Sequence, residues 1–315
     1  MVRKSGLGFN FFNLDFLNLF SMKNYMEYIF YKLFLLIILI IIILYYLNNR
    51  LNNKDFFTNN NDNINLYIGI TSIPIRLKYI HNTLNSLLNQ DVKPTKIFVF
   101  LPDKSIRLKM DYNINDIQKD KINDPDNIIE YITGVNDEGP ITKFYPLLDR
   151  IPKNKNNFLV VADDDIVYPK SRIGDIKKYI NIDSNNSYGF SGRKYLKNAK
   201  GEDLRFYTNI FKEVDILEGF DIMVFPRNIF PDNSNDLLIW VKSLPKESFF
   251  VDDIVLSKWC DLNNSKRFIY PKQENNKFYN EVDDVPDIIK NVELLNENLN
   301  GRNMEIFKVL FSKKN

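Results

Sequence analysis

Hydrophobic and polar residues divide the chain into an apolar N-terminal segment, a polar linker and a long region of short alternating patterns. Residues 28–47 read YIFYKLFLLIILIIIILYYL, which is about the twenty residues that a membrane-spanning helix needs. Lys32 is the only charge in this run, and it lies near one end, where a lysine can reach the lipid headgroups. Tyrosines near both ends suit the aromatic belt of a membrane interface. We therefore expect a transmembrane signal anchor at residues 28–47.

A cleaved signal peptide and a buried core helix are the alternatives for this segment. The apolar run is long for a signal peptide, and no small-residue cleavage site follows it. So long an aliphatic run also rarely fits a globular core. Lysine and arginine are slightly more frequent before the span than after it, which favours a cytosolic N-terminal segment at residues 1–27. The rest of the chain would then be lumenal, as in the ER or Golgi, or otherwise non-cytosolic.

The pattern changes twice after the apolar run. Residues 48–63 are dominated by asparagine, which is typical of a flexible stalk. From residue 64, short apolar runs alternate with stretches of helical spacing such as 77–89. This alternation predicts one α/β domain at 64–281 with a sheet covered on both faces, followed by a helical extension at 282–315 packed on it. The runs that we interpret as strands are 66–71, 96–101, 128–132 and 158–162.

The composition narrows the chemistry that this domain can carry. One cysteine permits no internal disulfide and no cysteine-based metal site, and one histidine rules out sites with two or three histidine ligands. The chain has 42 Lys+Arg and 40 Asp+Glu, so its net charge of +2 gives no strong case for a nucleic-acid partner. We expect no nucleic acid as a partner, and acid–base or metal chemistry that uses aspartate and glutamate.

The strongest candidate site is the triplet Asp163-Asp164-Asp165, which directly follows the apolar run 158–162. Ligands of open α/β sheets bind beyond the carboxyl ends of the strands. Adjacent carboxylates repel one another and suit a hard divalent cation such as Mg²⁺ or Mn²⁺. Asp163 and Asp165 point the same way if the strand geometry continues. The alternative is a solvated acidic loop, which the triplet alone does not exclude.

Six short segments between about residue 66 and residue 270 carry further motifs. They are 71–77 (TSIPIRL, compare T-x-I-P-x-R), 86–90 (SLLNQ, compare S-L-L-x-Q), 139–143 (GPITK, compare G-P-x-T-K), 161–169 (VADDDIVYP, compare D-D-D-x-x-Y-P), 218–220 with 226–227 (EGF and PR, compare E-G-F…R-R), and 252–257 (DDIVLS, compare D-D-V-x-L-S). In this order they resemble a family-2-like group of the GT-A glycosyltransferases, within the nucleotide-diphospho-sugar transferase superfamily. Each motif is weak alone, and the shared order makes the resemblance specific.

The resemblance implies both a fold and an activity. The fold would be α/β of the GT-A, Rossmann-like type, with a mixed, mainly parallel sheet flanked by helices and a single transmembrane helix before it. The activity would be that of a membrane-anchored, metal-dependent glycosyltransferase of the hexosyltransferase type. The partners would be a nucleotide-diphosphate sugar as donor and a glycan, glycoprotein or glycolipid as acceptor.

The resemblance also implies which residues meet the donor. An arginine such as Arg76 can pair with phosphate or stack on the base, and Lys143 can neutralise the diphosphate leaving group. The alternative for both is a solvated surface charge. We expect the nucleotide sugar to contact Thr71, Arg76, Lys143, Asp163 and Asp164, and we expect Asp165 and Asp163 to hold Mn²⁺ or Mg²⁺.

Asp252 and Asp253 are the candidate catalytic residues. They follow the apolar run 249–251, and a carboxylate beside aromatic bulk can have a raised pKa and act as a general base. By resemblance, the second acid, Asp253, would be the base of an inverting reaction. The alternative is that one of the two caps a helix at 254–260.

Glu218 and Asp221 are expected on the acceptor side, with a simple turn as the alternative. The chain departs from the family pattern here, because Asp221 and Pro226 stand where the group often has glycine and tyrosine or arginine. Many GT-A enzymes also have a late histidine ligand, and this chain has no histidine after His81. We therefore expect weak metal binding in the absence of nucleotide.

Two other functions stay open at this stage. A nucleotidyltransferase would use similar metal carboxylates, although the membrane anchor and the Asp252-Asp253 pair argue against it. A non-catalytic protein that binds nucleotide sugars or glycans on a decayed GT-A scaffold would explain the departures at Asp221 and Pro226. Retention of Lys143 and of the aspartate motifs counts against it.

Overall fold

The computed structural model describes residues 27–45, 63–180, 184–198, 201–208, 210–271, 280–281 and 299–311. The chain divides into two units, Met1–Thr58 and Asn59–Asn315, and each is described by itself. In the first unit, residues Glu27–Tyr45 form a helix of 19 residues with none of its apolar surface buried. Its length and composition suit a membrane anchor and a signal sequence alike. The last two residues of the predicted span, and all but residue 63 of the predicted stalk, lie outside the described residues.

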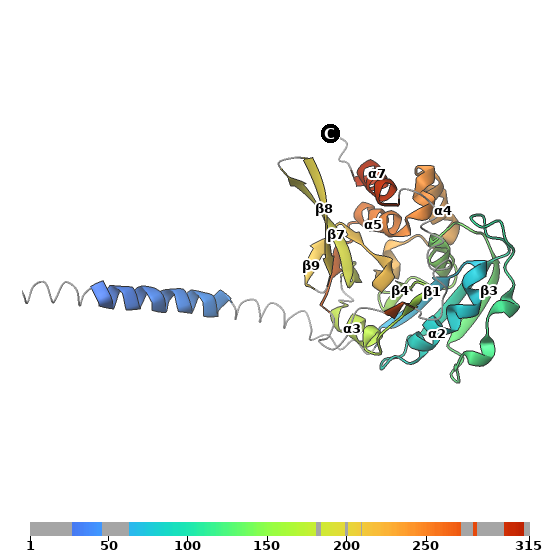
Figure 1. The fold of residues 1–315 in the computed structure, drawn as a ribbon, viewed down its shortest axis with the longest axis horizontal. Coiled ribbons are helices and arrows are strands. Elements are labelled where there is room, and N and C mark those ends of the chain that lie inside the picture. Colours follow the sequence, from blue (N-terminus) through green and yellow to red (C-terminus); the bar gives the residue numbers. More distant parts are fainter. Residues whose placement is uncertain are drawn as a thin grey trace, which may run out of the picture. The chain divides into compact units, whose positions relative to one another are not determined.

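The second unit is an α/β domain built on an eight-stranded, mixed and mostly parallel sheet (Figure 1). The strand order is β3-β2-β1-β4-β11-β6-β12-β9. The first four strands are parallel to one another, β6 is parallel to β12, and the other three pairings are antiparallel. The strands are β1 (Asn65–Thr71), β2 (Lys96–Pro102), β3 (Ile129–Val135), β4 (Asn157–Val161), β6 (Ser187–Gly189), β9 (Lys212–Val214), β11 (Met223–Pro226) and β12 (Arg267–Ile269).

Helices cover both faces of this sheet, so its central strands are buried on both sides (Figure 1). One core contains Ile68, Val99 and Val160, whereas the other contains Phe100 and Val161. This double burial explains why β4 reads as a continuous apolar run. The helices are α2 (Ile80–Leu88) and α3 (Arg172–Tyr179) on the first face, and α4 (Ser234–Lys242), α5 (Asp252–Leu262) and α7 (Leu299–Phe311) on the second.

Two smaller sheets complete the domain. One has the order β10-β7-β8 and the other pairs β5 with β13. Helix α7 packs on the domain through Ile306 and Phe307, which are both 3% exposed. Residues 282–298, which belong to the predicted C-terminal extension, lie outside the described residues. The strands are β5 (Ile166–Val167), β7 (Ser191–Asn198), β8 (Gly201–Thr208), β10 (Ile216–Leu217) and β13 (Asn280–Glu281).

Short 3-10 helices form much of the remaining chain. The helix predicted at 77–89 divides into η2 and α2, and the helix predicted after Pro140 consists of two such turns, η5 and η6. A side-chain carbon on Gly69 of β1 would lie 1.9 Å from the carbonyl oxygen of Lys143, so only glycine lets η5 pack this close to the sheet. The 3-10 helices are η2 (Pro74–Tyr79), η3 (Ile114–Asp116), η4 (Lys119–Lys121), η5 (Ile141–Lys143), η6 (Tyr145–Leu147), η7 (Gly219–Asp221), η8 (Arg227–Ile229) and η9 (Lys246–Phe250).

Candidate active site

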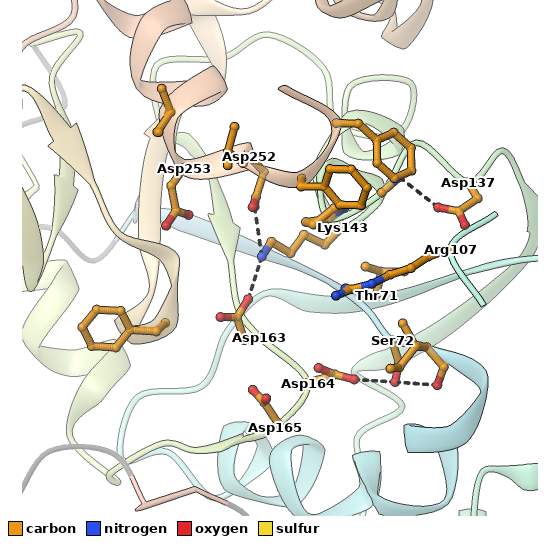
Figure 2. Close-up of a pocket in the computed structure, with 18 of the residues that line it drawn as sticks. Thr71, Ser72, Arg107, Asp137, Lys143, Asp163, Asp164, Asp165, Asp252 and Asp253 are labelled. Carbon is orange, nitrogen blue, oxygen red and sulfur yellow. Dashed lines mark hydrogen bonds and ion pairs between the residues drawn. The ribbon is translucent and has the colours of Figure 1, made fainter. Parts of the chain in front are cut away.

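A cavity of about 460 Å³ lies at the carboxyl ends of β1 and β4 (Figure 2). Its wall combines these strand ends with η5, the residue before η7, and the first turn of α5. The fold thus brings together segments that are almost two hundred residues apart, and nine of the ten predicted site residues line the same cavity. They are Thr71, Arg76, Lys143, Asp163, Asp164, Asp165, Glu218, Asp252 and Asp253.

Lys143 is a buried cation between two carboxylates (Figure 2). Its Nζ lies 2.6 Å from Oδ1 of Asp163 and 3.0 Å from Oδ2 of Asp252, and the residue is only 5% exposed. Burial alone would lower the pKa of Lys143, but Asp163, Asp252 and Asp253 together raise it well above its usual value. The ammonium group therefore stays charged and links the aspartate triplet to the start of α5.

The three aspartates of the triplet have different surroundings. Asp164 accepts hydrogen bonds from Ser72 Oγ at 2.5 Å and from Arg76 at 3.2 Å, and its side chain is 10% exposed. Asp163 and Asp165 are more open, with side chains 29% and 32% exposed. Alternate carboxylates therefore have access to the cavity, as the spacing predicts. The carboxylate of Asp164 is instead held by the first loop of the domain.

Arg76 and Thr71 fix the opposite wall of the cavity. Nη1 of Arg76 lies 3.1 Å from Oδ2 of Asp165 as well as close to Asp164, and the residue is 8% exposed. Its guanidinium is thus paired with acids rather than solvated as an ordinary surface charge. The hydroxyl of Thr71 donates to the carbonyl of Phe100 at 2.8 Å, which ties the end of β1 to β2.

Asp252 and Asp253 lie in the first turn of α5, and the capping interpretation is wrong. The N-cap residue is Val251, and no side chain caps the helix. Oδ1 of Asp253 instead accepts a hydrogen bond from the backbone of Gly219 at 3.1 Å. Burial and the neighbouring Asp252 raise the pKa of Asp253 well above its usual range, although Lys143 opposes this. A carboxylate with a raised pKa accepts a proton readily, which suits a general base.

The two predicted acceptor-side residues are separated by the structure. Glu218 lines the cavity and accepts hydrogen bonds from Ser191 at 2.8 Å and Arg193 at 2.5 Å. Asp221 lies outside the cavity, is fully buried, and forms an ion pair with Arg172 at 3.1 Å. In this arrangement Asp221 holds η7 against α3 rather than facing a ligand.

Several cavity residues were not predicted from the sequence. Arg107 comes from the loop after β2 and points into the cavity (Figure 2). Asp137 holds this loop, because its carboxylate accepts hydrogen bonds from the backbone of Ile106 at 2.7 Å and of Gly139 at 2.9 Å. The only local signal is an aspartate just before the Gly-Pro turn. The other unpredicted residues include Tyr112, Arg193, Phe220 and, from α7, Asn303.

The donor set fits a divalent cation only if a ligand completes the coordination. Among the described residues, no group of three or more His, Cys, Asp or Glu side chains could hold a metal ion. Asp163 and Asp165 offer two carboxylates at the cavity, and Mg²⁺ is commonly held by one or two carboxylates with phosphate and water oxygens. These residues therefore fit a cation that arrives together with a diphosphate.

No protein-family model matches this chain, and no curated protein sequence matches it. The functional argument therefore depends on the geometry of the cavity and on the motifs that line it.

Proposed function

We propose that the protein is a membrane-anchored glycosyltransferase of the GT-A type, which uses a divalent cation to transfer a sugar from a nucleotide-diphosphate sugar to an acceptor hydroxyl. One observation carries this proposal. The ordered motifs meet in a single cavity at the carboxyl ends of parallel strands, where two open carboxylates, a buried lysine and a high-pKa aspartate line the same space. Each of these groups has a role in sugar transfer.

The donor is expected at the β1 and β4 side of the cavity. A divalent cation held by Asp165 and Asp163 would neutralise negative charge on the diphosphate. Lys143 is already positioned beside Asp163, so its ammonium group can stabilise the same charge as the leaving group departs. Arg76 keeps Asp164 and Asp165 in place and adds positive charge for phosphate.

The acceptor is expected between Asp253 and Glu218. Asp253 would take the proton of the acceptor hydroxyl while its oxygen attacks the anomeric carbon and the nucleoside diphosphate leaves. One displacement of this kind inverts the anomeric configuration. Gly219 matters for this geometry, because a side-chain carbon there would lie 2.8 Å from Oδ1 of Asp253.

The N-terminal helix would act as an uncleaved anchor, with residues 1–27 cytosolic and the catalytic domain lumenal or otherwise non-cytosolic. Protease protection in sealed microsomes tests this topology. Digestion of the domain from the cytosolic side would contradict it.

The direct test of function is a panel of nucleotide-diphosphate sugars, assayed for nucleoside diphosphate release with and without Mn²⁺. The variant Asp165→Ala should lose this activity. The exposed Asp126 lies outside the cavity, so Asp126→Ala is a matched control that should keep the activity. If no donor binds or reacts in the wild-type protein, the proposal fails.

One observation favours a second function, the binding of nucleotide sugars without catalysis. Both proposed metal ligands are already paired with cations, Asp163 with Lys143 and Asp165 with Arg76. A metal ion must compete with these pairs. Binding of a nucleotide sugar without turnover across many acceptors would select this function.

A further inference from the structure

A second cavity of about 570 Å³ adjoins the first one. It lies behind η9, the short segment that leads into Asp252 and Asp253, and it shares Arg107, Phe249, Phe250 and Asp252 with the first cavity. Its lining is mainly apolar, and its size is that of small-molecule sites in proteins. The apolar side chains come from the loop after β2, from η5, α4, η9 and α5, and include Ile141, Val241, Leu244, Phe250 and Val255.

A buried hydroxyl in this cavity lacks a partner. Ser248 is 4% exposed, and within the described residues its Oγ makes no hydrogen bond. Leaving a buried polar group unpaired costs about 1–3 kcal/mol, so such groups are rare in native structures. A ligand with a polar atom at this wall would satisfy the hydroxyl.

The charges around the cavity leave an excess of positive charge. Its two carboxylates are paired, because Glu138 lies 2.6 Å from Lys242 and Asp252 lies 3.0 Å from Lys143. Lys246 also lines the cavity, is exposed, and makes no ion pair with any residue that the structure describes. An anionic group is therefore the complementary head group for a ligand whose body is apolar.

We propose that this second cavity binds a single-chain anionic amphiphile, such as a fatty carboxylate. The chain lies among Ile141, Leu244 and Val255, and the acid group meets Lys246 and the hydroxyl of Ser248. This site does not depend on the proposed transferase activity, because it uses a separate cavity and requires neither metal nor nucleotide.

The test uses the full chain in phosphatidylcholine nanodiscs and a photoreactive dodecanoate with a diazirine on its chain. Crosslinked peptides are mapped by mass spectrometry. We expect saturable labelling of the peptides that contain residues 241–255, and competition by dodecanoate but not by dodecanol. Labelling of the apolar helix Glu27–Tyr45 serves as an internal standard, because a lipid-exposed helix should label without saturation.

Two variants separate the contributions of cavity and charge. Leu244→Trp fills the cavity and should abolish labelling of 241–255, whereas Lys246→Glu reverses an exposed charge and should weaken it about tenfold. Lys170→Glu, at an exposed lysine outside both cavities, is the matched control and should label as wild type. Labelling confined to the N-terminal helix, equal competition by dodecanol, or labelling unchanged in both variants would overturn the proposal.

Discussion

Replacement of Lys143 by methionine should destabilise the domain through electrostatics rather than packing. Methionine keeps an apolar stem of similar length but removes the ammonium that lies 2.6 Å from Asp163 and 3.0 Å from Asp252. Asp163, Asp252 and Asp253 then face one another without a cation. Removing one partner of a buried pair costs about 3–5 kcal/mol, and we take about 3 kcal/mol because the side chain of Asp163 is 29% exposed.

Thermal unfolding of the full chain measures this effect. For a domain of this size, about 2–4 °C is lost for each kcal/mol, so Lys143→Met should unfold about 6–12 °C below wild type near pH 7.5. The raised pKa of Lys143 means that its stabilising charge is present at all pH values below its usual pKa and is lost only as pH rises through the folded value. In the variant the penalty comes from ionised carboxylates, so it should shrink as pH falls and they take up protons.

Two outcomes would refute this reasoning. The first is a loss of stability that is the same at pH 5 and pH 7.5, because lost packing does not titrate near these values. The second is a failure of Asp252→Asn to restore part of the stability in the Lys143→Met background. That second change removes one of the unpaired charges, so the two substitutions should not be additive.

Three further predictions follow from the same site. Burial and Asp252 raise the pKa of Asp253, so its ionised form destabilises the fold as pH rises above the usual carboxyl range; Asp253→Asn should raise the midpoint of thermal unfolding at pH 7.5 while lowering transfer about 10²–10⁴-fold, and a lower midpoint would contradict this. Calorimetry should detect only weak Mn²⁺ binding without nucleotide and tighter binding with a nucleoside diphosphate, and tight binding to the nucleotide-free protein would argue against shared coordination. Arg172→Met should cost about 3–5 kcal/mol in denaturant unfolding, because Asp221 would remain buried without its cation, and added Asp221→Asn should recover part of that loss.

The half of the sheet that precedes Asp163 could be predicted from the sequence. Strands β1, β2 and β4 are buried on both faces, so each forms an apolar run that stands out from its surroundings. The strands after it are short, and several have only two to four residues, which is too few to show any period. Their places in the sheet depend on pairing between distant segments, which local patterns do not record.

The candidate site was predicted in part for the same reason. The aspartate triplet follows a strong strand, and Lys143 belongs to a recognisable Gly-Pro turn, so both could be found from local sequence. Arg107 and Asn303 come from an irregular loop and from the C-terminal helix, and only the folded chain brings them to the cavity. The capping interpretation of Asp252 and Asp253 failed because α5 begins one residue earlier, at Val251, which leaves both acids inside the first turn.

The central claim is that this cavity transfers a sugar from a nucleotide-diphosphate donor. The most direct test measures nucleoside diphosphate release by the full chain across a panel of such donors with Mn²⁺, for wild type, Asp165→Ala and the control Asp126→Ala. The account predicts release from at least one donor that requires Mn²⁺, is lost in Asp165→Ala and is kept in Asp126→Ala. Absence of release with every donor, or release that is unchanged in Asp165→Ala, would contradict it.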